Sequence, residues 1–420
     1  MKILKKGDYI MSNFQKNLEK YAELAVKVGV NVQKGQTLVV NTTLDAAEFV
    51  RLVVKKAYEA GAHNVVVNWS DDAVSRTKYE LAPDEAFTEY PEWRAKEMEE
   101  LAENGAAFMS VVSASPDLFK GINPERIANF QKAAGKALSN YRKMMMSDKV
   151  SWTVIAAPST GWADKVFPDA PADERVQLLW DAIFKATHTN VENPVEAWKK
   201  HDETLHEKVN YLNNKRYKKL HYTAPGTDLT IELPEKHLWC GAGSINEKGH
   251  EFMANMPTEE VFTVPLRTGV NGTVSSTKPL SYGGNIIDHF TLTFENGRIV
   301  DVKAEEGEEI LKQLVETDEG SHYLGEVALV PFNSPISQSN LLFYNTLFDE
   351  NASNHLAIGS AYAFCLEGGK QMSGEELKEH GLNESLTHVD FMIGSAEMDI
   401  DGITADGTSE PVFRNGDWAF

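Results

Sequence analysis

The chain has 420 residues, which is long enough to bury large cores and favours two domains over one. Its hydrophobic fraction of 42% and charged fraction of 25% are those of a folded globular protein, so general disorder is excluded. With 41 Lys and Arg against 62 Asp and Glu, the net charge is −21, and such a surface repels nucleic-acid phosphates and anionic membranes. We therefore expect no nucleic-acid or membrane partner.

Two cysteines, Cys240 and Cys365, are too few for a disulfide framework and do not make a structural zinc site by themselves. The sequence also lacks a run of about 18 apolar residues, the length that a membrane-spanning helix needs. We therefore expect a soluble cytoplasmic protein. Its acidity mostly serves solubility, although composition alone leaves open whether some carboxylates form a site for cations.

Helix and strand signals alternate in the first half of the chain. Apolar residues at helical spacing predict helices, and short apolar runs between them predict strands. The predicted helices are residues 12–28, 45–60, 93–103, 124–146 and 172–186, and the predicted strands are residues 37–40, 65–67, 106–112 and 152–156. The unbroken run Val65–Val67 predicts a strand that is buried on both faces. Repeated β-α units of this kind indicate a parallel sheet covered by helices.

The pattern changes near residue 215, where polar and basic sequence leads to a turn-forming cluster at Ala224–Gly226. Beyond it strands predominate, and Asn296-Gly297 separates the two strands of a predicted hairpin. We predict an α/β fold of two domains: an N-terminal parallel-sheet α/β domain, residues 1–215, and a C-terminal mixed α+β domain, residues 216–420.

Common signatures of other enzyme classes are missing from the sequence. The chain has neither a G-x-S-x-G nor a G-x-x-x-x-G-K-[ST] motif, and its glycines lack the spacing of a dinucleotide-binding loop. His206-Glu207 is not followed by the second histidine of a zincin motif. The parallel sheet is therefore not expected to bind a nucleotide cofactor.

A strand predicted at residues 386–393 carries His388 and Asp390, two positions apart. Residues i and i+2 of a strand point to the same face, so the imidazole and the carboxylate are expected to project together. Such a pair either presents two ligands to a cation or makes a plain hydrogen bond, and the sequence alone leaves both open.

Further acids and a second histidine lie beside apolar runs in the same half of the chain. Glu350 and His355 flank a turn-like stretch in which the asparagines are expected to act in caps or turns, and Glu326 adjoins an apolar run. One residue of the pair Glu259-Glu260 is expected to face the interior. Because burying an unpaired carboxylate costs several kcal/mol, each glutamate either lies at an exposed strand end or is compensated by cations. The whole donor set suits two divalent metals that share a carboxylate.

These segments resemble a known family. They look like the signature segments of the thermophilic aminopeptidases, the family of aminopeptidases T and S and of PepS. The matching segments are residues 255–263, 324–330 and 348–357, followed by the closing pair His388-x-Asp390. The resemblance also covers residues 17–40 and extends over nearly the whole chain. Its main departure is a leader before Met11, which contains none of the site residues.

The resemblance implies a metal-dependent aminopeptidase that cleaves the N-terminal peptide bond of short peptides and forms a homodimer. It implies two divalent ions per subunit, with Zn²⁺ and Co²⁺ expected first and Mg²⁺ or Mn²⁺ also compatible. It gives Glu326 a bridging position, which makes it a candidate general base, and places Tyr362 where its phenol would stabilise an oxyanion. The implied metal ligands are Glu260, Glu326, Glu350, His355, His388 and Asp390.

The residues alone leave other functions open. A different dimetal hydrolase, such as a phosphoesterase or an amidase, would use the same donors. A non-catalytic protein would use them to bind metal or peptide without turnover. Without the resemblance, Tyr362 would be interpreted as a core aromatic residue.

Overall fold

The structure is a computed structural model that describes residues 6–282 and 285–420. The first five residues of the leader lie outside the described residues. Two compact units make up the chain, one of Met1–His201 with Gly243–Pro257 and the other of Asp202–Ala242 with Thr258–Phe420. The bounds of these units do not coincide with residue 215, and the predicted division into two domains there stays a prediction.

The first unit is built on a four-stranded parallel sheet with the order β2-β1-β3-β4. The strands are β1 (Thr37–Thr43), β2 (Asn64–Ser70), β3 (Ala107–Val112) and β4 (Trp152–Ala156). A short ribbon, β8 (Ser244–Ile245) with β9 (Glu251–Phe252), belongs to the same unit. The alternating β-α pattern of the first half therefore gives the predicted parallel-sheet α/β region.

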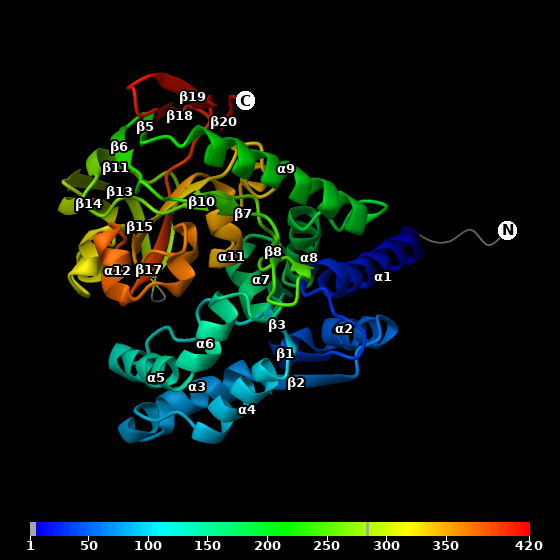
Figure 1. Ribbon diagram of the computed structural model, residues 1–420. Coiled ribbons are helices and arrows are strands. Elements are labelled where there is room, and N and C mark those ends of the chain that lie inside the picture. Colours follow the sequence, from blue (N-terminus) through cyan, green and yellow to red (C-terminus); the bar gives the residue numbers. More distant parts are fainter. Residues whose placement is uncertain (1–5, 283–284) are drawn as a thin grey trace. The chain divides into compact units, whose positions relative to one another are not determined.

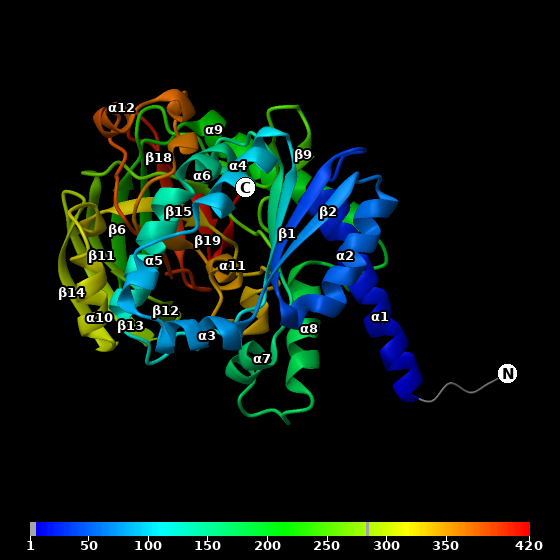
Figure 2. The ribbon, with the colours of Figure 1, turned by 90° about the horizontal axis from the view of Figure 1, so that it is seen from below.

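Helices cover both faces of this sheet (Figures 1 and 2). The helices of this unit are α1 (Lys6–Leu24), α2 (Ala47–Glu59), α3 (Asp72–Leu81), α4 (Glu92–Glu103), α5 (Pro124–Ala137), α6 (Ser139–Met146), α7 (Thr160–Val166) and α8 (Arg175–Ala186). A further helix, α9 (Pro194–Lys215), begins in this unit, and most of its length belongs to the second unit. On one face, Phe108 of β3 packs with Ala102 of α4 and Tyr141 of α6. On the other, Tyr21 of α1 stacks on Phe49 of α2 with 5.0 Å between the ring centroids. None of the helices in the described residues is long and apolar enough to cross a membrane.

Two sequence predictions for this unit are wrong. The strand predicted at residues 65–67 is β2, but its valines are only half-buried because β2 is the edge strand of the sheet. The single helix predicted over residues 124–146 is divided into α5 and α6, because the backbone of Leu138 leaves the helical conformation at φ −92° and ψ 10°.

The described residues of the second unit form two antiparallel sheets. The larger has nine strands: β5 (Lys219–Ala224), β6 (Thr227–Glu232), β11 (Val270–Ser275), β12 (Leu280–Tyr282), β13 (Asn285–Glu295), β14 (Arg298–Glu306), β18 (Asp399–Ile403), β19 (Ser409–Arg414) and β20 (Asp417–Trp418). The smaller, in the order β17-β16-β15-β10-β7, consists of β7 (Cys240–Gly241), β10 (Val261–Thr263), β15 (Leu324–Leu329), β16 (His355–Gly359) and β17 (His388–Met392). Short helices accompany them: α10 (Glu308–Val315), α11 (Thr346–Asp349) and α12 (Gly374–Glu379).

Turn chemistry sets the hairpins of the larger sheet. Asn296 and Gly297 have φ values of 48° and 83°, the positive values that a two-residue hairpin turn requires, and they join β13 to β14 as predicted. A Cβ on Gly297 would lie 1.8 Å from the Arg267 carbonyl oxygen, so only glycine fits. The turn-forming cluster at Ala224–Gly226 makes a second hairpin, between β5 and β6.

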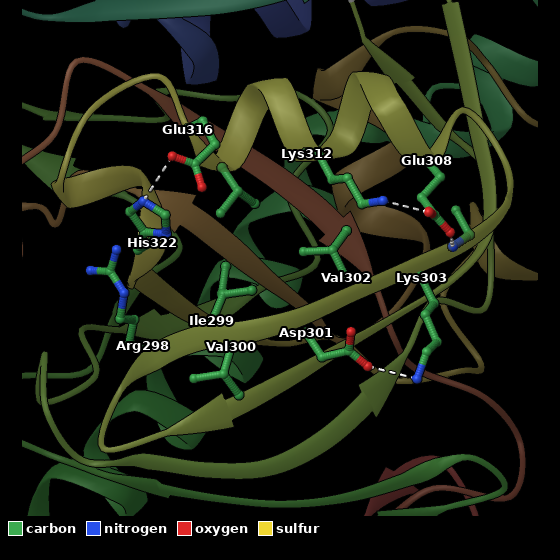
Figure 3. A pocket seen from close by; sticks show the side chains of 12 residues that line it. Arg298, Ile299, Val300, Asp301, Val302, Lys303, Glu308, Lys312, Glu316 and His322 are labelled. Carbon is green, nitrogen blue, oxygen red and sulfur yellow. Dashed lines mark hydrogen bonds and ion pairs between the residues drawn. The ribbon is translucent and has the colours of Figure 1, made fainter.

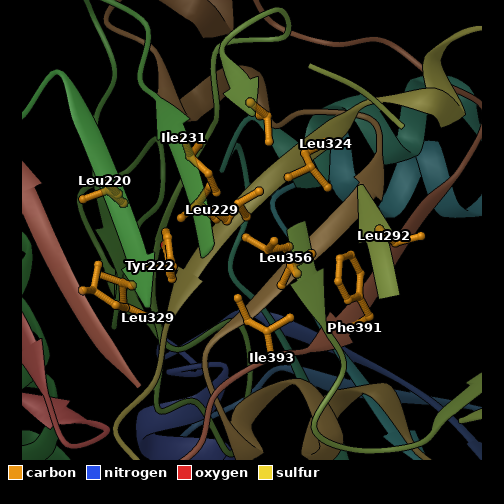
Figure 4. Packing of buried hydrophobic residues seen from close by; sticks show 14 of the residues in the cluster. Leu220, Tyr222, Leu229, Ile231, Leu292, Leu324, Leu329, Leu356, Phe391 and Ile393 are labelled. Atoms are coloured by element: carbon orange, nitrogen blue, oxygen red, sulfur yellow. The ribbon is translucent and has the colours of Figure 1, made fainter. Parts of the chain in front are cut away.

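The two sheets share one hydrophobic core (Figure 4). Leu220, Leu229 and Leu292 enter it from the larger sheet. Val327, Leu356 and Phe391 enter it from the smaller sheet. This core fixes which face of the smaller sheet is left for polar side chains.

Shortening a core side chain at this interface should destabilise the fold. Leu292 of β13 is fully buried, so Leu292→Ala should lower the free energy of unfolding by about 2–5 kcal/mol through lost contacts and a residual cavity. The matched control is Leu386→Ala, since Leu386 is 87% exposed and its truncation should change stability by less than about 0.5 kcal/mol. Urea unfolding measures both. Equal losses in the two variants would contradict the assignment of this core.

Candidate metal centre

The smaller sheet turns one face to the core and the other to a cluster of acids and histidines. Side chains alternate between the faces along each strand. The core face is formed by Val261, Val327, Leu356 and Phe391. Each has a neighbour in sequence that projects from the opposite face: Glu260, Glu326, His355 and Asp390. Residues that are far apart in the sequence thus meet on one side of one sheet.

Strand register brings the central residues into a row. Glu326 of β15 lies opposite Ala357 of β16, and Ala357 lies opposite Asp390 of β17. Ala357 is fully buried, and its methyl group is the side chain that lies between the two carboxylates in this row. Ala357 was not among the residues predicted from the sequence. It lies two residues after His355 on a strand, and this spacing indicates that both side chains point to the same face.

Glu326 lies at the centre of the cluster, and its two oxygens face different histidines. Its Oε1 is 3.4 Å from His355 Nε2, and its Oε2 is 3.6 Å from His388 Nε2. Glu260 Oε2 lies 3.2 Å from His355 Nε2, and Asp390 Oδ1 lies 3.4 Å from His388 Nε2. The donor atoms therefore form two groups, each within 4.8 Å, and Glu326 belongs to both.

Backbone carbonyls orient both imidazoles. His355 Nδ1 lies 3.2 Å from the Ser353 carbonyl oxygen, and His388 Nδ1 lies 2.7 Å from that of Ser360. Each Nε2 is thereby turned toward the acids, which is how metal-binding imidazoles are commonly fixed. Gly359, opposite His388, has to be glycine because a Cβ there would lie 2.2 Å from the Thr387 carbonyl oxygen.

Burial excludes the exposed strand end that the sequence left open for Glu326. Glu326 is 4% exposed in a strand whose residues are all buried, so it does not lie at an exposed strand end. Glu259 and Glu260 are both buried, at 5% and 7% exposure, where the sequence predicted one. His355 Nε2 and Asp390 Oδ1 are also buried, and the polar atoms beside them belong to the cluster itself.

The electrostatics of the cluster show how strongly its charges interact. Burial raises the pKa of Glu326 to about 7, with His355 opposing the shift and Asp390 and Glu260 adding to it. Burial lowers the pKa of His388, but Asp390 and Glu326 outweigh that effect and raise it to about 9. Negative charge crowded into a buried space calls for positive charge between the carboxylates. Oxygen and imidazole donors of this kind fit divalent cations.

Glu350 and Tyr362 lie at the margin of the cluster. Among the described residues, neither donor group includes Glu350, and its predicted role as a ligand stays a prediction. Glu350 follows α11 and lines a pocket of about 40 Å³ together with Asp390. Burial, with Glu260 and Asp390, raises its pKa well above the usual value.

Tyr362 follows β16, with its ring centroid 4.7 Å from that of His388. Burial and the charges of Glu326 and Asp390 raise the pKa of its phenol, which therefore stays protonated and able to donate a hydrogen bond.

Asn351 is a supporting residue whose contact the sequence did not reveal. It is fully buried, its Oδ1 accepts a 2.7 Å hydrogen bond from the Glu259 backbone N–H, and its Nδ2 donates to the Leu347 carbonyl. It therefore ties the segment that carries Glu260 to the segment that carries Glu350. An asparagine directly after the two acids Asp349 and Glu350 was the only signal, and a turn explained it equally well.

A larger pocket of about 930 Å³ lies elsewhere in the second unit, between β14 and α10 (Figure 3). Its charged side chains pair with each other: Lys312 lies 2.6 Å from Glu308, and Lys303 lies 2.7 Å from Asp301. None of the residues in the two donor groups around Glu326 lines this pocket. Its size does not make it the functional site.

Buried carboxylates and imidazoles that converge around one glutamate fit the class of metal-dependent hydrolases. The comparisons with known proteins agree with this class. The family model described as thermophilic metalloprotease (M29) matches residues 14–418, and the chain belongs to this family.

Curated relatives match over nearly their whole length. The chain is 72% identical to aminopeptidase AmpS of Bacillus subtilis, over 98% of this chain and 100% of that protein. It is 54% identical to aminopeptidase 2 of Geobacillus stearothermophilus, over 98% of this chain and 99% of that protein. The solved structure of wild-type AmpT from Thermus thermophilus superposes with a TM-score of 0.92 at 44% identity, covering 97% of this chain and 100% of that chain. The mixed α/β fold is thus confirmed.

Removing the Asn351 side chain should loosen the centre. Asn351→Ala leaves the Glu259 N–H and the Leu347 carbonyl without their partner, so the free energy of unfolding should fall by about 1–3 kcal/mol. Zn²⁺ affinity should fall by about 10–100-fold, as for other residues that support ligands. Urea unfolding and competition with a zinc indicator measure the two effects. The control is Asn104→Ala at an exposed position; if Asn351→Ala matches it in both assays, the supporting role is wrong.

Proposed function

We propose that this protein is a metal-dependent aminopeptidase that hydrolyses the N-terminal peptide bond of short peptides. The observation that carries the proposal is the buried carboxylate of Glu326, whose two oxygens face His355 and His388 separately. Membership of the metalloprotease family supports hydrolysis of a peptide bond. The names of the relatives, aminopeptidases AmpS and 2, support attack at the N-terminal residue.

We propose two divalent ions per subunit, Zn²⁺ or Co²⁺, with Mg²⁺ or Mn²⁺ as alternatives that the same donors accept. Such ions lower the pKa of a water toward neutrality and polarise the scissile carbonyl. The proposed ligands are Glu260, Glu326, His355, His388 and Asp390, with Glu350 as the predicted sixth. The fit rests on the buried oxygen and imidazole donors that converge around Glu326.

The chain's own residues supply the remaining chemistry. The protonated phenol of Tyr362 donates a hydrogen bond to the oxyanion that develops on the scissile carbonyl. A carboxylate of the cluster accepts the proton of the attacking water, and Glu326 is our candidate for this base. The free α-amine of the substrate would be held at the cluster by a metal or by a nearby acid, which favours cleavage at the N-terminus over internal cleavage.

We further propose that the protein acts in the cytoplasm as a homodimer. The cytoplasmic assignment rests on the two free thiols in a chain of this length. The homodimer rests on the family resemblance. Short peptides are the proposed substrates, with no nucleic-acid or membrane partner.

Removing the charge of Glu326 tests the proposed centre. Glu326→Gln keeps the side-chain volume but weakens both cation positions at once, because Glu326 belongs to both donor groups. We expect kcat/KM on an aminoacyl p-nitroanilide with added Co²⁺ or Zn²⁺ to fall by more than about 100-fold, since loss of a supporting residue alone costs about 10–100-fold. Glu384→Gln, at a side chain that is 64% exposed, is the matched control and should keep the wild-type rate. Undiminished hydrolysis by Glu326→Gln would contradict the bridging position.

The same assay separates the alternative functions. Activity that survives EDTA, in protein shown to be metal-free by elemental analysis, would rule out the metal centre. Hydrolysis of phenyl phosphate but not of the aminoacyl anilide would indicate a phosphoesterase. Metal binding without turnover of any peptide would indicate a non-catalytic protein.

A further inference from the structure

The two cysteines of the chain lie close together in the second unit. Cys240 is in β7, and Cys365 ends a short 3₁₀ helix at Ala363–Cys365. The segments beside them run antiparallel: the Leu238 N–H donates to the Cys365 carbonyl at 2.8 Å, and the Glu367 N–H donates to the Lys236 carbonyl at 2.9 Å. This backbone pairing places Cys365 beside Leu238, two residues before Cys240, although the two cysteines are far apart in sequence.

The two side chains meet in one hydrophobic cluster with Val264 and Leu382. Cys240 Sγ lies 3.9 Å from the carbonyl oxygen of Phe364, the residue directly before Cys365. Both are free thiols; Cys365 is buried and Cys240 is partly exposed. A small oxidant from solvent therefore reaches Cys240 first.

Both cysteines are attached to segments that carry residues of the metal centre. Cys240 of β7 is paired with Phe262 of β10, and Phe262 lies two residues after Glu260 in the sequence. Cys365 follows Tyr362 by three residues, and the ring of Tyr362 stacks on Phe364 at a centroid distance of 5.2 Å. A covalent link between the cysteines would therefore join the segment of Glu260 to the segment of Tyr362.

We propose that Cys240 and Cys365 form a reversible disulfide when the protein meets a hydroperoxide, and that this bond slows hydrolysis at the metal centre. The disulfide itself is independent of the proposed peptidase function. Only its effect on the rate rests on that function.

The chemistry takes two steps. The Cys240 thiolate attacks one peroxide oxygen and breaks the O–O bond, which gives a sulfenic acid and, for hydrogen peroxide, one water. The Cys365 sulfur then attacks the Cys240 sulfur, forms the S–S bond and displaces the hydroxyl group as a second water. Two thiols are oxidised and one peroxide is reduced. A small thiol such as dithiothreitol reverses the step by exchange.

Bond formation requires the sulfur atoms to approach to about 2.05 Å. The short 3₁₀ helix that carries Cys365 lies outside the sheets, and closing the proposed bond would shift its Cys365 end toward Cys240. Its shift would displace Tyr362 at its start from His388. Because displacement of a catalytic group by about 1 Å can cost about 100-fold, a rate loss of about tenfold or more is expected.

Thiol counting on the full-length protein tests the bond directly. The protein is treated with hydrogen peroxide, denatured and alkylated with iodoacetamide, and its intact mass is measured. We expect the wild type to lose both alkylation sites and two hydrogen atoms within one chain, and dithiothreitol to restore both sites. Cys240→Ser, at the partly exposed position, should form no link within the chain. Two alkylatable thiols after treatment, or a sulfinic acid on Cys240 with Cys365 unchanged, would overturn the proposal.

The effect on the rate is tested separately with the aminoacyl anilide. Peroxide should slow the wild type by about tenfold or more, dithiothreitol should restore the rate, and Cys240→Ser should keep its rate under peroxide. A disulfide that forms without any loss of rate, or an equal loss in Cys240→Ser, would overturn the coupling between the cysteines and the metal centre. A wild type without peptidase activity before oxidation would instead contradict the proposed function, while the thiol count would still decide the disulfide.

Discussion

A carboxylate buried in the middle of a β-strand is the constraint on which the rest of the second unit depends. Glu326 is 4% exposed, and every residue of its strand is buried. Such a group costs several kcal/mol unless positive charge lies next to it. His355 and His388 supply donors on either side of it, and their backbone partners Ser353 and Ser360 keep them there. The geometry suits cations that are shared through one carboxylate.

The two-sheet core makes this arrangement possible. Because Leu356 and Phe391 are held in the core, their neighbours His355 and Asp390 are held on the opposite face. A slip of one residue in either strand would exchange the two sets and remove the donors from the cluster. The hydrophobic core and the polar centre are therefore two results of the same strand register. Ala357 lies between Glu326 and Asp390 in the register of the three strands, so a larger side chain at this position would come between the two carboxylates.

Much of this was predictable, because the relevant signals are local. The i, i+2 spacing of His388 and Asp390 placed both on one face of β17, and the structure confirms it. The alternation of helices and strands gave the parallel sheet, and Asn296-Gly297 gave the hairpin. The apolar run after Glu326 indicated a buried strand, but only the resemblance to a family chose between an exposed strand end and a cation site.

The remainder depended on contacts between distant segments. Asn351 bonds to the Glu259 backbone, 92 residues away, and no local pattern separates that role from a turn. The edge position of β2 follows from strand order, which a run of valines does not encode. Glu350 resembles the other acids in sequence, yet it lies outside both converging donor groups of the described residues. Whether a side chain such as Glu350 reaches the cluster depends on strand order and tertiary contacts, which the local sequence does not encode.

The central claim is that Glu326 is shared by two divalent cations. Crystals grown with Zn²⁺ and measured at the zinc absorption edge test it most directly, because anomalous scattering locates each ion without reference to activity. The account predicts two peaks per chain, one on each side of the Glu326 carboxylate and about 3.5–4 Å apart. A single peak, or peaks bound by residues other than Glu326, would contradict it.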